Sequence, residues 1–233
     1  MAVHAVVFDW GGTLSEFVPA EMVDAWRLVA RHLDPAREEE TTARLVAVEA
    51  AFWDTTATHQ RSGTLADLLA AATNDLGIDA AEALLEEAAV RQLDAWTPHV
   101  RHDPDAVGVL GELRHRGLAV GLLSNTHWPP AFHERFLERD GLAELLDARL
   151  YTSAMEFQKP HPSAFLAALD ALGVDDPANA VFVGDRPFDD IHGARQAGMR
   201  TVLRRNEGVP GYDVEPDAVI DRLTELVPLL ACW

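Results

Sequence analysis

Cysteine and lysine are the two residue types that this sequence nearly lacks. Cys232 is the only cysteine among 233 residues, and Lys159 is the only lysine. A lone cysteine excludes a disulfide within the chain, which fits a reducing compartment, and we expect a cytoplasmic protein. Positive charge is also scarce, because 19 Lys and Arg residues against 38 Asp and Glu residues give a formal net charge of −19. Nucleic acids and anionic membranes both require clustered positive charge, so we expect neither as a partner.

Long hydrophobic runs are missing as well. No stretch approaches the roughly 20 apolar residues of a membrane-spanning helix. The apolar run near the N-terminus is only as long as a strand and lacks the basic residues of a signal peptide. We therefore expect neither a membrane span nor a leader. With 48% hydrophobic residues, the chain can form one sizeable core, or a core and a small accessory domain.

The hydrophobic pattern changes twice along the chain. Residues 5–8 form an apolar, partly β-branched run that is typical of a buried strand. Helical spacing then predicts helices at about 20–32, 37–58, 64–76 and 79–95. After Thr97-Pro98, helices and strands alternate. Helices are expected from Asp103-Pro104 to Gly117, from His161-Pro162 to Gly173 (with Phe165, Leu166, Leu169 and Leu172 on one stripe), over 189–198 and at the C-terminus. Strands are expected at 118–125, 180–185, 199–204 and 217–220.

Strands that alternate with helices and are almost continuously apolar indicate an α/β fold with a doubly wound parallel sheet. The first strand precedes the helical block, so we expect residues 1–16 and 98–233 to form a Rossmann-like core and residues 17–97 to be an inserted helical cap. Ligands of such sheets bind beyond the carboxyl ends of the strands. Three polar residues follow predicted strands and become the first candidates: Asp9, Ser124 and Asp185.

Four segments around these positions resemble, in the correct order, the four motifs of the haloacid dehalogenase-like (HAD) hydrolases. They are FDWGGTL at 8–14, LLSNT at 122–126, the lysine of QKPHPSAF at 158–165, and VFVGDRPFDDIHGA at 181–194. Each motif is short and weak alone, but their order and their placement on the expected elements make a specific signal. The resemblance covers essentially the whole chain. It implies a helical cap of the C1 type, a small anionic substrate and a magnesium ion.

The resemblance also assigns roles to residues. Asp9 would be the nucleophile that forms a covalent aspartyl intermediate, and Ser124 would hydrogen-bond the substrate's phosphoryl oxygen. Thr13 would anchor the first motif through a local hydrogen bond of its hydroxyl. Lys159 is notable on composition alone, because the only lysine falls in the third motif. A compact ammonium fits between a carboxylate and a phosphoryl oxygen, where a broad guanidinium would not.

The metal would be held by Asp9, the backbone carbonyl of Gly11, Asp185 and Asp190, with Asp189 as a neighbouring candidate. Carboxylate and carbonyl oxygens are the ligands that magnesium prefers. For substrate binding we favour residues next to the catalytic positions: Trp10, Gly12, Asn125, His127 and Trp128. For three further polar or aromatic residues an ordinary core or surface role is favoured: Trp53, His59 and Arg61. His99 and His102 lack the further Cys or His that a zinc site needs, so we expect solvated loop histidines.

Gly11 is the main departure from the family pattern. In the family's phosphatases this position, two residues after the nucleophile, holds an aspartate that protonates the leaving oxygen and later deprotonates water. Such acid–base help is typically worth about 10²–10⁴ in rate, or roughly 3–5 kcal/mol. Ordinary phosphomonoester hydrolysis would therefore be slow, or limited to leaving groups that need no proton, such as acyl or enol phosphates.

Three other functions are compatible with the missing acid to different degrees. A 2-haloacid dehalogenase needs no proton donor for a departing halide, but typically lacks the magnesium pair that GDRPFDD retains. A phosphonoacetaldehyde hydrolase has a similar first motif but needs a cap lysine for a Schiff base, and residues 17–97 contain none. A catalytically impaired domain could bind phosphorylated ligands only. We favour magnesium-dependent hydrolysis of a small phosphorylated metabolite and leave the oligomeric state open.

Overall fold

The structure is a computed structural model that describes residues 3–16, 22–55 and 58–233. Its centre is a sheet of six parallel strands in the order β3-β2-β1-β4-β5-β6. The strands are β1 (Ala5–Phe8), β2 (Ala119–Ser124), β3 (Ala148–Tyr151), β4 (Ala180–Gly184), β5 (Arg200–Arg204) and β6 (Ala218–Ile220). The helices that alternate with these strands or follow the last one are α5 (Ala106–His115), α6 (Pro130–Arg139), α7 (Pro162–Ala171), α8 (Gly193–Gln196) and α9 (Leu226–Leu230). The predicted parallel α/β fold is confirmed.

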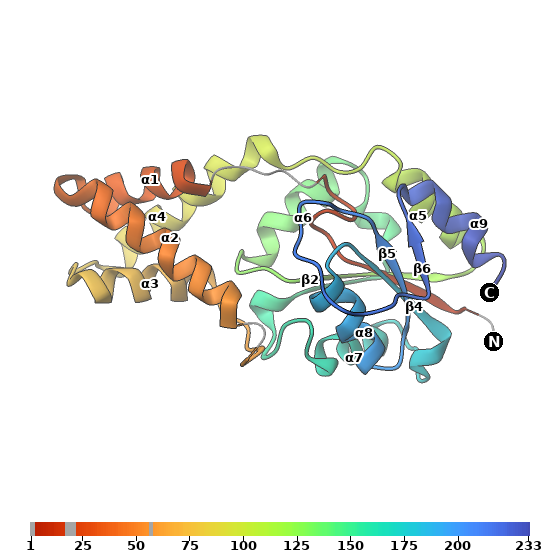
Figure 1. The fold of residues 1–233 in the computed structure, drawn as a ribbon. Helices are drawn as coiled ribbons and strands as arrows, with labels where there is room; N and C mark the ends of the chain where they lie inside the picture. Colours follow the sequence, from red (N-terminus) through yellow and green to blue (C-terminus); the bar gives the residue numbers. More distant parts are fainter. Residues whose placement is uncertain (1–2, 17–21, 56–57) are drawn as a thin grey trace.

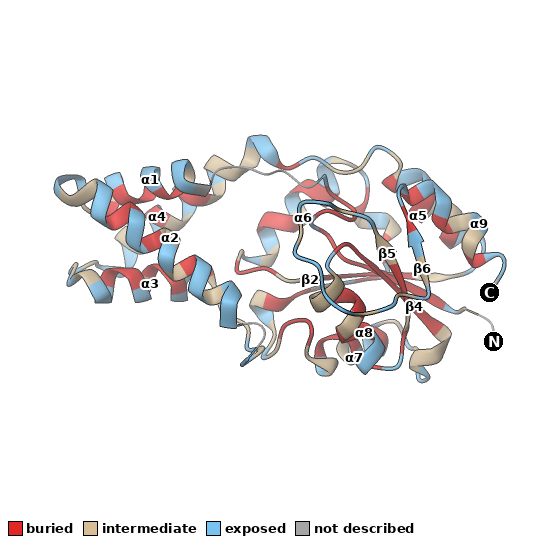
Figure 2. Cartoon of the chain, viewed as in Figure 1, coloured by how far each residue is buried: buried red, intermediate tan, exposed pale blue. Residues whose placement is uncertain are grey.

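Helices cover both faces of the sheet (Figure 1). Alternate residues of β1 point to opposite sides, since successive side chains of a strand alternate. Val6 and Phe8 pack in one hydrophobic cluster with residues of α5, α6 and α9. Ala5 and Val7 pack in a second cluster with residues of α7 and α8. The central strands β1, β2 and β4 are therefore buried on both faces, as Figure 2 shows, which explains their almost continuously apolar sequences.

Four further helices form a bundle to one side of the sheet (Figure 1). They are α1 (Met22–Leu33), α2 (Glu38–Asp54), α3 (Leu65–Leu76) and α4 (Glu82–Trp96). This bundle has a hydrophobic cluster of its own around Trp26, Leu45 and Leu69. Capping explains the sharp limits of α3. Thr64 and Asp67 form a capping box at its start, and Gly77 ends it in the left-handed conformation. The predicted residues 20, 21, 56 and 57 of these helices lie outside the described residues.

Several boundaries differ from the prediction. The segment expected as a helix over 189–198 starts as a π-helical turn, η7 (Pro187–His192), and continues as α8. Leu166 does not share the buried stripe of Phe165 and Leu169 on α7, because it is 46% exposed. α6 and β3 were not predicted, and both carry charged residues at exposed positions. No helix in the described part of the chain is long and apolar enough to cross a bilayer.

Candidate active site

The three polar residues predicted at strand ends lie beyond one edge of the sheet. Asp9 follows β1, Ser124 ends β2 and Asp185 follows β4, and β1 lies between β2 and β4 in the sheet. Their carboxyl ends therefore meet at the position where parallel sheets bind ligands. All three side chains are buried. The sheet brings these residues together although they are far apart in the sequence, since Asp9 lies more than a hundred positions from both Ser124 and Asp185.

Lys159 joins this group from the loop between β3 and α7. Its Nζ donates hydrogen bonds to Asp9 Oδ1 at 2.6 Å and to Asp190 Oδ1 at 2.7 Å. Burial alone would lower the pKa of Lys159, but the charges of Asp190 and Asp9 outweigh it and raise the pKa above its usual value. The side chain is only 1% exposed. The only lysine of the chain is therefore a buried, permanently charged group against the candidate nucleophile.

Asn125 holds the lysine backbone in place. Its Nδ2 donates to the Lys159 carbonyl at 2.8 Å, and its Oδ1 accepts from the Lys159 backbone N–H at 2.9 Å. This reciprocal pair ties the end of β2 to the loop that carries the ammonium group. The side-chain amide of Asn125 thus positions the backbone of Lys159.

Three carboxylates gather at the same edge with more negative charge than Lys159 can balance. One oxygen each of Asp9, Asp185 and Asp190 lies within 4.8 Å of the others. Burial, only partly offset by Lys159, raises the pKa of Asp9 to about 6. Burial and the charges of Asp9 and Asp190 raise the pKa of Asp185 to about 7. Such a cluster is the donor set that a hard divalent cation uses.

Asp185 has a free coordination position. Its Oδ2 accepts a hydrogen bond from Asn206 Nδ2 at 2.6 Å, while its buried Oδ1 has no hydrogen-bond partner among the described residues. A buried carboxylate oxygen without a partner is costly. A cation beside Asp9 and Asp185 would satisfy it, so the residues present fit a metal ion.

Two glycines of the first motif differ in what their surroundings allow. Gly12 has φ +80°, and a Cβ there would lie 2.1 Å from Asp185 Oδ2. Glycine is therefore required at position 12 for the close approach of Asp185. A Cβ at Gly11 would meet no heavy atom within 4 Å, and its φ lies outside the left-handed region. A Cβ at position 11 thus fits without rearrangement.

A cavity of about 480 Å³ is lined by Asp9, Ser124 and Lys159, whereas Asp185 and Asp190 lie outside its wall. All five residues predicted to bind substrate line it, which are Trp10, Gly12, Asn125, His127 and Trp128. Trp53 also lines it, although the sequence analysis favoured an ordinary role. The described residues around the cavity do not include His59 or Arg61. Asp189, the neighbouring metal candidate, reaches the cavity wall, and burial raises its pKa to about 6.

The expectation of a solvated loop histidine is wrong for His102. Trp10 Nε1 donates to His102 Nε2 at 3.0 Å, and His102 Nδ1 lies 2.7 Å from Asp140 Oδ2. Because Nε2 accepts from the indole, the proton of the neutral ring sits on Nδ1 and is donated to Asp140. This buried relay fixes the indole that follows Asp9 in the sequence. The local sequence around His102 was misleading, because its two hydrogen-bond partners, Trp10 and Asp140, come from distant segments of the chain. His99 is exposed, as expected.

The local hydrogen bond expected for the Thr13 hydroxyl is also absent. Thr13 is fully buried, and its Oγ1 has no hydrogen-bond partner among the described residues. The backbone anchors this turn instead. The Ser15 N–H donates to the Trp10 carbonyl at 2.7 Å, and the Thr13 carbonyl accepts from the Arg204 guanidinium.

Comparisons with known proteins identify the family of this chain. The haloacid dehalogenase-like hydrolase family matches residues 3–198. The chain belongs to this family. It is 30% identical to a phosphoglycolate phosphatase of Rhodospirillum rubrum over 94% of this chain and 85% of that protein. It is 41% identical to a phosphoserine phosphatase of Thermus thermophilus over 53% of this chain, and this match spans about half (49%) of that relative's length. The solved structure of a 2-haloacid dehalogenase from Pseudomonas syringae has a TM-score of 0.74 and 27% identity over 99% of both chains.

Several residues at the site of this HAD hydrolase were not predicted from the sequence, among them Asn206 and Glu49. Asn206, which holds Asp185, lies just beyond β5, so the rule that strand ends carry functional residues could have found it. Glu49 lines the cavity from α2, within an Ala/Glu-rich helix where a buried acid has no distinguishing signal. Only its contacts with Trp26 of α1 and with His127 set this glutamate apart from its exposed neighbours.

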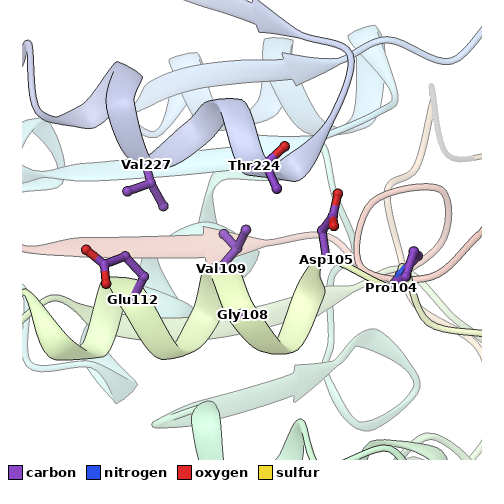
Figure 3. Close-up of a pocket in the computed structure, with 7 residues that line it drawn as sticks. All are labelled: Pro104, Asp105, Gly108, Val109, Glu112, Thr224 and Val227. Carbon is purple, nitrogen blue, oxygen red and sulfur yellow. The ribbon is translucent and has the colours of Figure 1, made fainter.

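A second pocket of the HAD hydrolase lies away from the strand ends. It has a volume of about 320 Å³ and lies between α5 and the C-terminal segment, lined by Val109, Glu112 and Val227 among others (Figure 3). None of the candidate catalytic residues lines it. Chemistry is therefore expected at the larger cavity.

Proposed function

We propose that this HAD hydrolase is a phosphatase that acts on a small phosphorylated metabolite, with Asp9 as its nucleophile and Mg²⁺ as its cofactor. The contact of Lys159 Nζ with Asp9 Oδ1 at 2.6 Å is the observation that carries the proposal. It holds a carboxylate and a cation together at the bottom of a cavity that is large enough for a small molecule.

In the proposed mechanism a carboxylate oxygen of Asp9 attacks phosphorus, and the bond to the leaving alcohol oxygen breaks in line. Ser124, buried beside Asp9 at the end of β2, donates a hydrogen bond to a phosphoryl oxygen and orients the group. The ammonium of Lys159 neutralises charge that develops on the phosphoryl oxygens. Water then attacks phosphorus of the acyl phosphate, which releases inorganic phosphate and restores the Asp9 carboxylate.

The metal-binding residues in this proposal are Asp9, Asp185, Asp190 and the backbone carbonyl of Gly11. The unpartnered Oδ1 of Asp185 and the raised pKa values of Asp9 and Asp185 support them. A bound Mg²⁺ would supply Lewis-acid stabilisation of the transferring phosphoryl group. Lys159 and the Arg186 N–H hold Asp190, with the latter donating to Asp190 Oδ2 at 2.9 Å. Asp190 would thus also orient the ammonium group.

Residues 17–97 are proposed as a C1-type cap on a core of residues 1–16 and 98–233. The separate hydrophobic cluster of α1–α4 supports this division, as does the cavity, which residues of α2 and α4 line together with strand-end residues. A cap in this position would exclude water during turnover. The lone, exposed Cys232 gives no internal disulfide and keeps a cytoplasmic location as our prediction.

Gly11 is proposed to occupy the position at which the family's phosphatases have the second aspartate of the first motif. The first motif of this chain therefore has no side chain there that could donate a proton to the leaving oxygen. We therefore expect leaving groups of low pKa, such as aryl, acyl or enol phosphates, to react faster than alkyl phosphates. Their oxygens depart without a proton donor.

A 2-haloacid dehalogenase is the second candidate. Gly11 and the structural similarity to the Pseudomonas syringae dehalogenase favour it. The acidic cluster of Asp9, Asp185 and Asp190 argues against it, because a cation on Asp9 would weaken its attack on carbon. A domain that only binds phosphorylated ligands is disfavoured by the retained contact between Lys159 and Asp9.

Turnover of aryl phosphates, acyl phosphates and 2-haloacids, each with Mg²⁺ and with a chelator, tests these alternatives. We expect phosphate release that requires Mg²⁺ and is abolished in Asp9→Asn. Haloacid turnover that is indifferent to chelator would replace the phosphatase proposal by the dehalogenase one. Tight phosphate binding without any turnover, retained in Asp9→Asn, would identify a binding domain.

A further inference from the structure

The cavity above Asp9 is unusually rich in tryptophan. Four of the six tryptophans of the chain line it: Trp10, Trp53, Trp96 and Trp128. They pack edge-on or tilted against one another and against His127. Trp10 lies 6.4 Å from Trp128 between ring centroids, and Trp53 lies 5.6 Å from His127. The faces of indole rings attract cations, and an ammonium group within about 6 Å of several rings is bound strongly when water is excluded.

Glu49 places a carboxylate in the same wall. It belongs to α2 and is only 4% exposed. Its Oε2 accepts a hydrogen bond from Trp26 Nε1 at 2.5 Å, which fixes the side chain. Its Oε1 forms no hydrogen bond with any described residue. This oxygen lies 3.5 Å from Nε2 of His127, which also lines the cavity.

The protein residues described around the cavity do not supply a cation for Glu49. His127 is buried, and burial lowers its pKa to about 3, so the ring is neutral. Lys159 is bound to Asp9 and Asp190, Arg186 lies 3.7 Å from Asp189, and Arg101 is exposed. Because no neighbouring cation among the described residues offsets the effect of burial, the pKa of Glu49 is raised to about 7. A cationic group of a ligand would restore the ionised carboxylate.

We propose that Glu49 and the four tryptophans select a substrate whose alcohol carries an ammonium group, so that the phosphoryl group lies at Asp9 and the ammonium lies between Glu49 and the indole rings. The substrate class is then the phosphate monoester of a small amino alcohol. Such an ester is an alkyl phosphate, so without an acid at position 11 its absolute rate is low, and the selection shows as a ratio between two alkyl phosphates. This inference rests on the proposed phosphatase function and deepens it. A leaving alcohol with a carboxylate is disfavoured, because it would face the Glu49 carboxylate.

A matched pair of substrates isolates the ammonium group. O-phosphoethanolamine and propyl phosphate have the same length and differ in a terminal ammonium against a methyl group. We expect the wild-type protein to show a kcat/KM at least tenfold higher for O-phosphoethanolamine. In Glu49→Gln, which keeps an acceptor for Trp26, this ratio falls to about one through a higher KM for O-phosphoethanolamine.

A second variant controls for the charge of the cavity as a whole. Glu16 is an exposed acid on the same cavity, and Glu16→Gln removes an equal charge without touching Glu49. The substrate ratio should stay at the wild-type value in this variant. A ratio that falls equally in both variants would show a general electrostatic effect and overturn the assignment of Glu49.

Binding to Asp9→Asn gives a readout that does not need turnover. Calorimetry should show tighter binding of O-phosphoethanolamine than of propyl phosphate, and the double variant with Glu49→Gln should lose the difference. Equal affinities in Asp9→Asn, or a preference of the wild type for 2-phosphoglycolate, would refute the ammonium site. Failure of the wild type to hydrolyse every phosphate, with the binding difference present, would refute only the proposed hydrolysis.

Discussion

Replacing Gly11 by aspartate tests how the missing acid limits this HAD hydrolase. The structure makes the substitution feasible, because a Cβ at position 11 meets no heavy atom within 4 Å and the backbone there is outside the left-handed region. Gly11 lines the cavity together with Asp9, so the substitution places the new carboxyl at the cavity wall.

The size of the gain depends on the leaving group. Positioned acid catalysis contributes about 10²–10⁴ in rate, or roughly 3–5 kcal/mol, when the leaving oxygen needs a proton. We expect Gly11→Asp to raise kcat/KM for an alkyl phosphate such as propyl phosphate by about this factor. An aryl phosphate such as p-nitrophenyl phosphate departs without a proton, so its kcat/KM should rise less than about tenfold.

Inorganic phosphate release under subsaturating substrate gives kcat/KM for both compounds. Gly11→Asn is the matched control, because it has the same shape and cannot transfer a proton as a carboxyl does. Equal kinetics of the Asp and Asn variants would refute the reasoning. An equal gain for the two substrates would also refute it, since the added group would then act on binding rather than on the leaving oxygen.

Three further predictions concern stability and metal binding. Gly12→Ala should lower the melting temperature by several degrees, because the new Cβ would lie 2.1 Å from Asp185 Oδ2 and position 12 has φ +80°. Gly11→Ala is the control and should leave the melting temperature nearly unchanged. Equal melting temperatures of the two variants would contradict the close approach of Asp185 to Gly12. Mg²⁺ at 100 times its dissociation constant should raise the unfolding free energy of the wild type by about 2.7 kcal/mol in denaturant titrations. Asp185→Asn should lose this stabilisation. If Mg²⁺ stabilises both proteins equally, it binds at a site without Asp185. Burial raises the pKa of Glu49 from 4.5 to about 7. Between these two pH values the folded protein binds more protons than the unfolded chain. The unfolding free energy of the protein therefore falls as pH rises through this range. Glu49→Gln should remove up to about 3 kcal/mol of this loss by pH 8, and parallel pH profiles of the two proteins would show that Glu49 titrates normally.

The candidate catalytic centre was predictable because it lies where short motifs meet strand ends. An apolar run followed by Asp9, and another followed by Asp185, indicate parallel strands with polar residues at one edge. Lys159 was distinguished by being the only lysine in a chain whose other Lys and Arg positions are all arginines. These features depend on local chemistry, and the parallel topology then brings them together with little freedom.

The walls of the cavity were less predictable. Trp53 and Glu49 occupy α2, where the sequence shows an ordinary amphipathic helix, and Trp96 ends α4. His102 has the sequence context of a surface loop, yet it accepts a hydrogen bond from Trp10 and contacts Asp140. Such partners are contributed by segments far apart in the chain, and no single-sequence pattern records their meeting.

The sequence by itself determined the parallel α/β fold, the helical insertion and the set of strand-end residues, because hydrophobic periodicity and motif order depend on neighbours along the chain. The tertiary structure alone decided which buried polar atoms lack a partner, notably Asp185 Oδ1 and Glu49 Oε1. Whether a polar atom is satisfied depends on everything packed around it. The metal site and the ammonium site that we propose both rest on these two oxygens.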